Sequence, residues 1–239
     1  MKNIKIYIAT HKKAKLPKMD GYIPIQVGSD LHEDLGYIKD NTGDNISRRN
    51  PNFCELTALY WIWKNEKDTD IIGLSHYRRY FFNNKKNNDF DNILSIEKID
   101  KILDEKDIIL PKKLKFGRKI TVKSQYYESH HTNDLLKCLE ISDKLYPNYS
   151  KSFRKVLKRK YLYAFNMFIM KKEDFDSYME WLFSIFSELE KEIDLEKYDS
   201  YNQRVFGFLS ERLFNVWVLN NKLKIKEITV SNIDENAII

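Results

Sequence analysis

A basic and aromatic run, HYRRY at residues 76–80, has the clearest chemical potential in the sequence. It directly follows the short apolar segment 70–75, and two adjacent arginines cannot both point into a core. Guanidinium groups present paired donors that fit phosphate oxygens. We therefore expect this run to bind the phosphates of a ligand, through His76, Tyr77, Arg78 and Arg79. A surface arginine pair bonded to nearby carboxylates is the alternative.

A long polar stretch, residues 28–50, contains the second candidate group, DLGYIKDNTGDNIS at 34–47. A loop of this length inside a compact domain usually has a function, and its glycines and short polar residues allow close approach to a ligand. Asp40 or Asp44 could take the proton of a reacting hydroxyl, or bind a sugar hydroxyl or a metal ion. We also expect ligand contacts from their neighbours Asn41, Thr42, Gly43 and Asn45. The alternative is a loop whose residues bond only to one another.

The helix expected over residues 201–219 carries a polar stripe formed by Arg204, Gly207, Glu211 and Asn215. Glycine inside a helix costs roughly 1 kcal/mol relative to alanine, so Gly207 indicates that something approaches the helix closely. Glu211 is a third candidate for a base that deprotonates a hydroxyl. It could equally be the ion-pair partner of Arg204 or Arg212.

Two adjacent histidines, His130 and His131, precede a helix expected to begin at Thr132. The start of a helix favours anions, so these imidazoles could help to hold a phosphate. We expect no metal site, because the spacing supplies no further ligands. Asn166 interrupts the apolar segment 161–170, and a buried amide needs hydrogen-bond partners. A sugar hydroxyl and a neighbouring backbone group are both open as its partner.

The elements that hold these residues are predicted by apolar periodicity. We expect strands at 4–8, 22–27, 70–75, 107–110, 161–170 and 223–230. We expect helices at 50–63, 96–103, 132–139, 175–193 and 201–219, the last opened by a capping box of Ser200 and Gln203. Pro24 marks the second strand as an edge or irregular strand, and residues 112–131 are expected to form a loop.

Alternating strands and helices predict an α/β fold, with a Rossmann-type, mostly parallel sheet flanked by helices and a helical C-terminal part. In such sheets, ligands bind beyond the carboxyl ends of the strands. That rule points to Thr10 and His11, to the loop after Val27, and to the segment after Ser75.

Composition restricts the class of protein. The 239 residues suffice for one domain, and the net charge of +6 suits a nucleotide diphosphate, an anionic lipid surface or a nucleic acid. Cys54 and Cys138 lie in apolar helical patterns and are expected to be free thiols in a reducing compartment. We see no signal peptide and no apolar run long enough to span a bilayer, which predicts a cytoplasmic protein, peripheral on a membrane at most. The basic run 151–160 is either a solvated face or a contact with an anionic leaflet.

Several segments together resemble the DUF4422 family of capsular and exopolysaccharide glycosyltransferases. They are IYIATHKK, YIPIQVG, DLGYIKDNTGDNIS, NPNFCELTALYWIWKN, GLSHYRRYF, FNMFIMKKEDF and QRVFGFLSERLFNVW, in order over nearly the whole chain. The resemblance implies a GT-A-like nucleotide-sugar transferase fold, with Thr10 and His11 beside the nucleotide base. It also implies that residues 76–79 stand where most GT-A enzymes carry an acidic Asp-x-Asp metal motif, which is absent from this segment.

The resemblance further implies transfer of a hexose, galactofuranose or galactose, from a UDP-sugar to a lipid-linked glycan in bacterial capsule, exopolysaccharide or O-antigen synthesis. A leaving diphosphate needs its charge neutralised, and Arg78 and Arg79 could do this without a cation. We therefore expect metal-independent catalysis with no required cofactor, with Mg²⁺ or Mn²⁺ as the alternative. In a single domain, 1–239, residues 1–111 would bind the nucleotide sugar, and 112–239 would face the acceptor through Asn166, Arg204 and Gly207.

Two other functions remain open. The missing acidic motif would suit a non-catalytic, nucleotide-sugar-binding partner in a polysaccharide assembly complex. A nucleic-acid-binding module would suit the charge and the aromatic content, but its usual motifs are missing from the sequence, and we expect no nucleic-acid partner.

Overall fold

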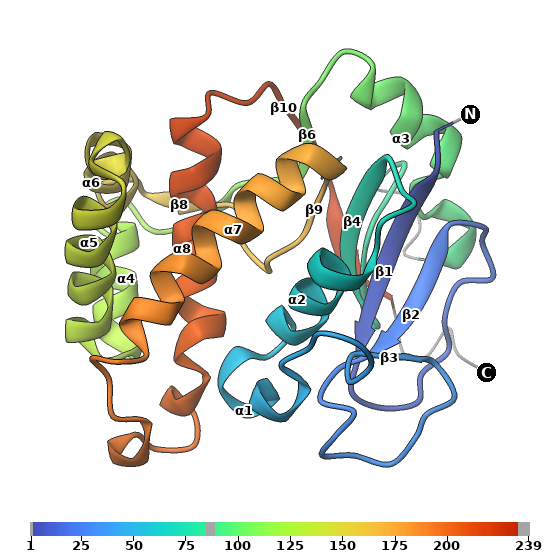
Figure 1. Ribbon diagram of the computed structural model, residues 1–239. Helices are drawn as coiled ribbons and strands as arrows, with labels where there is room; N and C mark the ends of the chain where they lie inside the picture. The colour runs from blue at the N-terminus through green and yellow to red at the C-terminus, as the bar shows by residue number, and fades with distance from the viewer. Residues whose placement is uncertain (1, 85–88, 234–239) are drawn as a thin grey trace.

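The computed structural model describes residues 2–84 and 89–233 and is built around a nine-stranded sheet. Seven strands follow the order β10-β6-β9-β4-β1-β2-β3, with β5 paired to β4 and β11 paired to β5 (Figure 1). Their bounds are β1 Ile4–Thr10, β2 Tyr22–Gln26, β3 Ile38–Lys39, β4 Ile71–His76, β5 Arg79–Phe81, β6 Ile108–Pro111, β9 Phe168–Lys171, β10 Ile225–Ile228 and β11 Val230–Asn232. A separate antiparallel pair is formed by β7, Leu114–Lys115, and β8, Tyr161–Leu162.

The sheet is mostly parallel at its centre, as predicted. Strand β1 pairs in parallel with both β2 and β4, and β6 pairs in parallel with β10. Strand β9 runs antiparallel between β4 and β6. Strand β2 is not the edge of the sheet, because β3 lies beyond it, but β3 pairs only with Ile25 and Gln26. Pro24 therefore lies in the part of β2 that β3 leaves unpaired.

The helices are α1 Asn50–Phe53, α2 Leu56–Asn65, α3 Ile96–Leu103, α4 Val122–Ser129, α5 Thr132–Leu145, α6 Ser150–Leu157, α7 Lys172–Leu189 and α8 Val205–Asn220. Short 3₁₀ helices occur at Ser47–Arg49, Phe90–Asn92, Pro147–Tyr149, Leu195–Lys197 and Asn202–Arg204. No described helix is both long enough and apolar enough to cross a membrane.

Helices cover both faces of the sheet. Strand β1 alternates between the two core clusters: Tyr7 packs with residues of α2, α7 and α8, whereas Ile6 packs with residues of α3. Helices α5 and α6 lie further out and pack against α7 and α8 (Figure 1). The alternation of apolar side chains in residues 4–8 thus reflects a strand buried on both faces.

Three local predictions about loops and helices are wrong. Residues 112–131 are not one loop, because Thr121 and Ser124 form a capping box that opens α4. The helix expected from residue 50 is broken, since Cys54 has a positive φ of 52° between α1 and α2. Helix α8 begins at Val205 with no side-chain cap, so the expected capping box of Ser200 and Gln203 does not form.

The expected strand 161–170 is divided into β8 and β9 by a tight turn. Phe165 and Asn166 both have positive φ angles, 77° and 50°, which an extended strand cannot contain. The two strands also belong to different sheets, since β8 pairs with β7 and β9 with β4 and β6. The break at Asn166 thus redirects the chain between two sheets.

Candidate active site

A cavity of about 760 Å³ opens at the carboxyl ends of β1, β2 and β4. Its walls include His11 after β1, Val27 after β2 and residues 76–79 at the end of β4. The opposite wall comes from helix α1 and from residues 201–212, at the start of α8. The cavity therefore lies at the edge of the sheet that the strand-end rule predicts.

Four arginines line the cavity: Arg78, Arg79, Arg204 and Arg212. The Arg79 guanidinium lies 4.0 Å from the centre of the Phe165 ring, and that of Arg78 lies 5.0 Å from the Tyr77 ring. Arg204 lies over Phe208 at 5.4 Å and donates a 3.3 Å hydrogen bond to the Cys54 sulfur. Stacking on these rings orients the guanidinium groups at the cavity wall.

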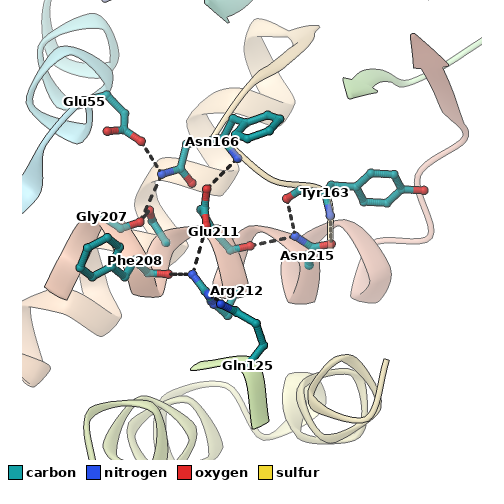
Figure 2. A network of polar contacts seen from close by, with 11 residues as sticks. Glu55, Gln125, Tyr163, Asn166, Gly207, Phe208, Glu211, Arg212 and Asn215 are labelled. Carbon is teal, nitrogen blue, oxygen red and sulfur yellow. Dashed lines mark hydrogen bonds and ion pairs between the residues drawn. The ribbon is translucent and has the colours of Figure 1, made fainter. Parts of the chain in front are cut away.

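Two carboxylates, Glu55 and Glu211, also line the cavity. Glu211 accepts a 2.7 Å bond from the backbone N–H of Phe165 and pairs with Arg212 at 3.1 Å. Arg212 also donates to the backbone oxygen of Phe208, at 2.8 Å, and to Gln125 (Figure 2). Burial raises the pKa of Glu211, and the charge of Arg212 acts in the opposite direction.

The turn at Phe165 and Asn166 contributes Phe165 to the cavity lining, and α8 holds this turn in place. Asn215 binds the backbone N–H and C=O of Tyr163 at 3.0 and 2.9 Å, one helical turn after Glu211 binds Phe165 (Figure 2). Asn166 donates 2.7 Å to Glu55 and 3.3 Å to the backbone oxygen of Gly207. The polar stripe predicted on this helix therefore faces the strained turn.

An aromatic group lies at the α4 side of the cavity. His130 stacks on Phe208 at 4.1 Å and on Tyr201 at 5.7 Å between ring centres. Tyr201 is 51% exposed, which is unusual for so large an aromatic side chain. Burial and, second, the charge of Arg212 lower the pKa of His130 to about 4, so its imidazole is neutral at pH 7.

Three further histidines line the cavity: His11, His32 and His76. His11 meets the Tyr77 ring edge-on at 5.3 Å, and burial lowers its pKa. The His76 Nε2 lies 2.8 Å from the backbone oxygen of Phe165, which ties the end of β4 to the strained turn.

The structure brings together about half of the residues selected from the sequence. The cavity is lined by His11, His76, Tyr77, Arg78, Arg79, His130, Arg204, Gly207 and Glu211. Outside its lining lie Thr10, Asp40, Asn41, Thr42, Gly43, Asp44, Asn45, His131 and Asn166. Asn166 nevertheless contacts the lining, through its bonds to Glu55 and Gly207.

The side chain of Asp40 is buried and bonded to neighbouring parts of the chain. Its buried carboxylate accepts hydrogen bonds from the backbone of Gly28 and Ser29 and from the hydroxyls of Ser47 and Thr57, at 2.6 to 3.0 Å. These four bonds hold the polar loop onto α2. The self-bonded loop, the alternative interpretation of this segment, describes Asp40 better than a role as a base.

The other residues outside the lining also have internal partners. Asp44 accepts a bond from the Tyr60 hydroxyl at 3.1 Å, and Thr42 accepts one from Trp61. The Thr10 hydroxyl donates to the backbone of Lys12, and His131 stacks on Tyr198. Asn45 bonds within its own loop, to the backbone oxygen of Gly43.

Gly207 is explained by the close approach of a neighbouring segment. A Cβ atom at this position would lie 3.1 Å from the sulfur and 3.3 Å from the Cβ of Cys54. The prediction that something approaches this helix closely is correct. The segment that approaches it is the break between α1 and α2. Both cysteines are free thiols, and burial raises the pKa of Cys54 to about 11, so it is not a thiolate at neutral pH.

The side chains around the cavity differ in chemistry from the usual ligands of a divalent cation. Across residues 2–84 and 89–233, no three His, Cys, Asp or Glu side chains are grouped to hold a metal ion. The strand-end side of the cavity presents arginines and histidines, whereas Mg²⁺ and Mn²⁺ prefer carboxylate and carbonyl oxygens. These residues do not fit a divalent cation at the predicted phosphate position.

The sequence of this chain matches a known family over most of its length. Residues 5–222 match DUF4422, which is described as a domain of unknown function. The chain belongs to the DUF4422 family. No curated protein matches it. The family predicted from the sequence is thereby confirmed.

Among solved structures, this DUF4422 chain is similar to that of the WbbM bifunctional glycosyltransferase in its apo form. The TM-score is 0.89 and the sequence identity 33%. The match covers 98% of this chain but 46% of the WbbM chain, so the DUF4422 chain spans about half the length of that protein.

Several residues that line the cavity of this DUF4422 chain were not predicted from its sequence, among them Glu55, Gln125, Phe165, Tyr201, Phe208 and Arg212. Glu55 lies in a segment whose apolar pattern predicts one continuous helix, so nothing set it apart. The motif FNMF at 165–168 held a usable signal, because Asn is among the few residues that adopt positive φ readily.

Proposed function

We propose that this chain is a glycosyltransferase that uses a nucleotide-sugar donor. The observation that carries the proposal is an arginine-lined cavity at the strand ends of a fold similar to that of a glycosyltransferase, at 33% identity over 98% of the chain. A nucleoside diphosphate fits such a cavity, because it combines a base that can stack on aromatic rings, ribose hydroxyls that can form hydrogen bonds and a diphosphate with concentrated negative charge.

The donor would lie with its base and ribose near His11 and its diphosphate near Arg78 and Arg79. These residues follow β1 and β4, whose carboxyl ends face the cavity. As the sugar leaves, negative charge grows on the diphosphate, and the guanidinium groups stacked on Phe165 and Tyr77 can stabilise it.

The acceptor would enter from the α4 side, where Tyr201, Phe208 and His130 form an aromatic surface. The apolar faces of sugar rings pack well on such surfaces, and Gln125 and Arg212 offer polar contacts at the same end. A lipid-linked glycan of capsule, exopolysaccharide or O-antigen synthesis is the acceptor class we propose. The donor we propose is a UDP-hexose, with galactofuranose or galactose as the sugar.

Catalysis would not require a divalent cation. The proposal is supported by the arginines at the predicted phosphate position and by the donor set, which does not fit Mg²⁺ or Mn²⁺ there. The protein would require no other cofactor.

Calorimetric titration with UDP, GDP, CDP and TDP, each in EDTA and in excess Mg²⁺ or Mn²⁺, tests this proposal. We expect one nucleotide class to bind, with equal affinity in EDTA. Arg78→Ala should weaken binding about 10–100-fold, since a charge-assisted hydrogen bond contributes about 1.5–3 kcal/mol. Arg118→Ala, an exposed arginine outside the cavity lining, is the matched control and should bind as the wild type does.

Two outcomes would contradict the proposal. A folded chain that binds no nucleoside diphosphate would remove its basis. Binding that disappears in EDTA would overturn metal independence while leaving the donor class in place.

A further inference from the structure

Two strained backbone segments from distant parts of the chain meet at Glu55. Cys54, the residue before it, has φ 52°, and Asn166, whose side chain binds it, has φ 50° next to Phe165 at 77°. Non-glycine residues in this region cost free energy and persist where the surrounding structure enforces them, most often at functional sites. Because both strained segments converge on the Glu55 carboxylate, we infer that this side chain has a function.

The turn that carries Asn166 is held rigidly from two sides. Glu211 of α8 accepts the Phe165 N–H at 2.7 Å, and His76 of β4 lies 2.8 Å from the Phe165 oxygen. Figure 2 shows the consequence, in which the Asn166 amide lies between Glu55 and the backbone oxygen of Gly207. The orientation of Glu55 is therefore set by the same turn that borders the cavity.

The two carboxylates that line the cavity differ in how many of their oxygens already accept hydrogen bonds. Both oxygens of Glu211 are engaged, Oε1 by the Phe165 N–H and Oε2 by Arg212. Glu55 uses Oε1 to accept from Asn166, and the described residues provide no hydrogen bond to its Oε2. Glu211 therefore positions the turn, whereas Glu55 presents an oxygen to the cavity that can accept a proton.

Glu55 is also placed between the charged groups of the site. It lies within electrostatic reach of Arg79, on the strand-end side, and of Arg204, at the start of α8. A base at this point stands between the proposed diphosphate position and the proposed acceptor side.

We propose that Glu55 is the catalytic base, with Asn166 as its positioning residue; this inference rests on the proposed glycosyl transfer. The acceptor hydroxyl oxygen forms a bond to the anomeric carbon while the bond from that carbon to the diphosphate oxygen breaks. The electron pair of the broken bond leaves with the nucleoside diphosphate, and the hydroxyl proton passes to Oε2 of Glu55. A single displacement of this kind inverts the configuration at the anomeric carbon.

The test compares Glu55→Gln, Glu211→Gln and a matched control, Glu180→Gln, an exposed glutamate of α7 that removes the same charge. Turnover is measured as a function of pH, nucleoside diphosphate binding by calorimetry, and the product anomer by NMR. Because the amide carbonyl introduced by Glu55→Gln can still accept from Asn166, we expect the fold and nucleotide binding to be kept. Turnover of Glu55→Gln should fall about 100-fold or more and lose its acidic limb.

Several results would overturn the inference alone. These are wild-type turnover by Glu55→Gln, an acidic limb that disappears in Glu211→Gln instead, or a product that retains the donor configuration. A wild-type chain that binds no nucleotide and transfers no sugar would overturn the glycosyltransferase proposal itself, and with it the role of Glu55.

Discussion

The side-chain amide of Asn166 donates a 2.7 Å hydrogen bond to the carboxylate of Glu55, although the two residues are 111 positions apart. The bond joins the turn between β8 and β9 to the break between α1 and α2. Both segments border the arginine-lined cavity, so this contact is one of those that tie the turn to the helical side of the cavity.

The strain at Asn166 can be separated from its hydrogen bond by comparing Asn166→Gly with Asn166→Ala. Both changes remove the bond to Glu55, but only glycine adopts a φ of 50° without cost. We expect Asn166→Ala to be about 1 kcal/mol less stable than Asn166→Gly by urea denaturation. Equal stabilities would mean that the turn relaxes and that its strain is not enforced.

Helix α8 and the break at Cys54 should be energetically coupled through Gly207. Alanine is favoured over glycine in a helix by about 1 kcal/mol, but here its Cβ would press against Cys54 at 3.1 Å. Gly207→Ala should therefore bring no gain in the wild type, and should stabilise a Cys54→Gly background by about 1 kcal/mol. A double-mutant cycle of unfolding free energies measures the coupling. Equal effects of Gly207→Ala in the two backgrounds would show that the contact carries no energy.

How far the sequence predicts this protein depends on the range of the interactions involved. The central strands and the strand-end position of residues 76–79 follow from local apolar patterns, and these predictions are confirmed. The Asp40 carboxylate turns inward to Ser47 and Thr57, and periodicity does not report such contacts. Glu55 could not be recognised from the sequence for a similar reason, since its position depends on Asn166, which is far away in the sequence.

Stability should depend on pH through His130. Its pKa is about 4 in the folded state against an ordinary value of 6.5, so between these values the unfolded chain binds a proton that the folded chain does not. This group therefore lowers stability as pH falls from about 6.5 to 4. His130→Phe keeps a ring against Phe208 and should show a shallower loss of denaturation midpoint over that range. Identical slopes for the two proteins would contradict the low pKa.

Tyr201 should act on the acceptor and not on the donor. Removing an exposed ring that forms a stacking surface costs about 1 kcal/mol or slightly more of binding, so Tyr201→Ala should raise the acceptor KM about tenfold. Tyr201→Phe keeps the ring and should keep the KM, and Leu145→Ala, an exposed apolar side chain on α5, serves as the control. A weaker affinity of Tyr201→Ala for the nucleoside diphosphate would place this surface on the donor side instead.

Mass spectrometry of a single reaction can show whether this chain transfers a sugar. The purified chain is incubated in EDTA with UDP-galactofuranose or UDP-galactose and a synthetic glycan carried on a lipid-like aglycone. We expect an acceptor that is heavier by one hexose, with UDP released in equal amount. A folded chain that binds these nucleotide sugars tightly but leaves both substrates unchanged would contradict this expectation, and would identify the protein as a non-catalytic nucleotide-sugar-binding partner.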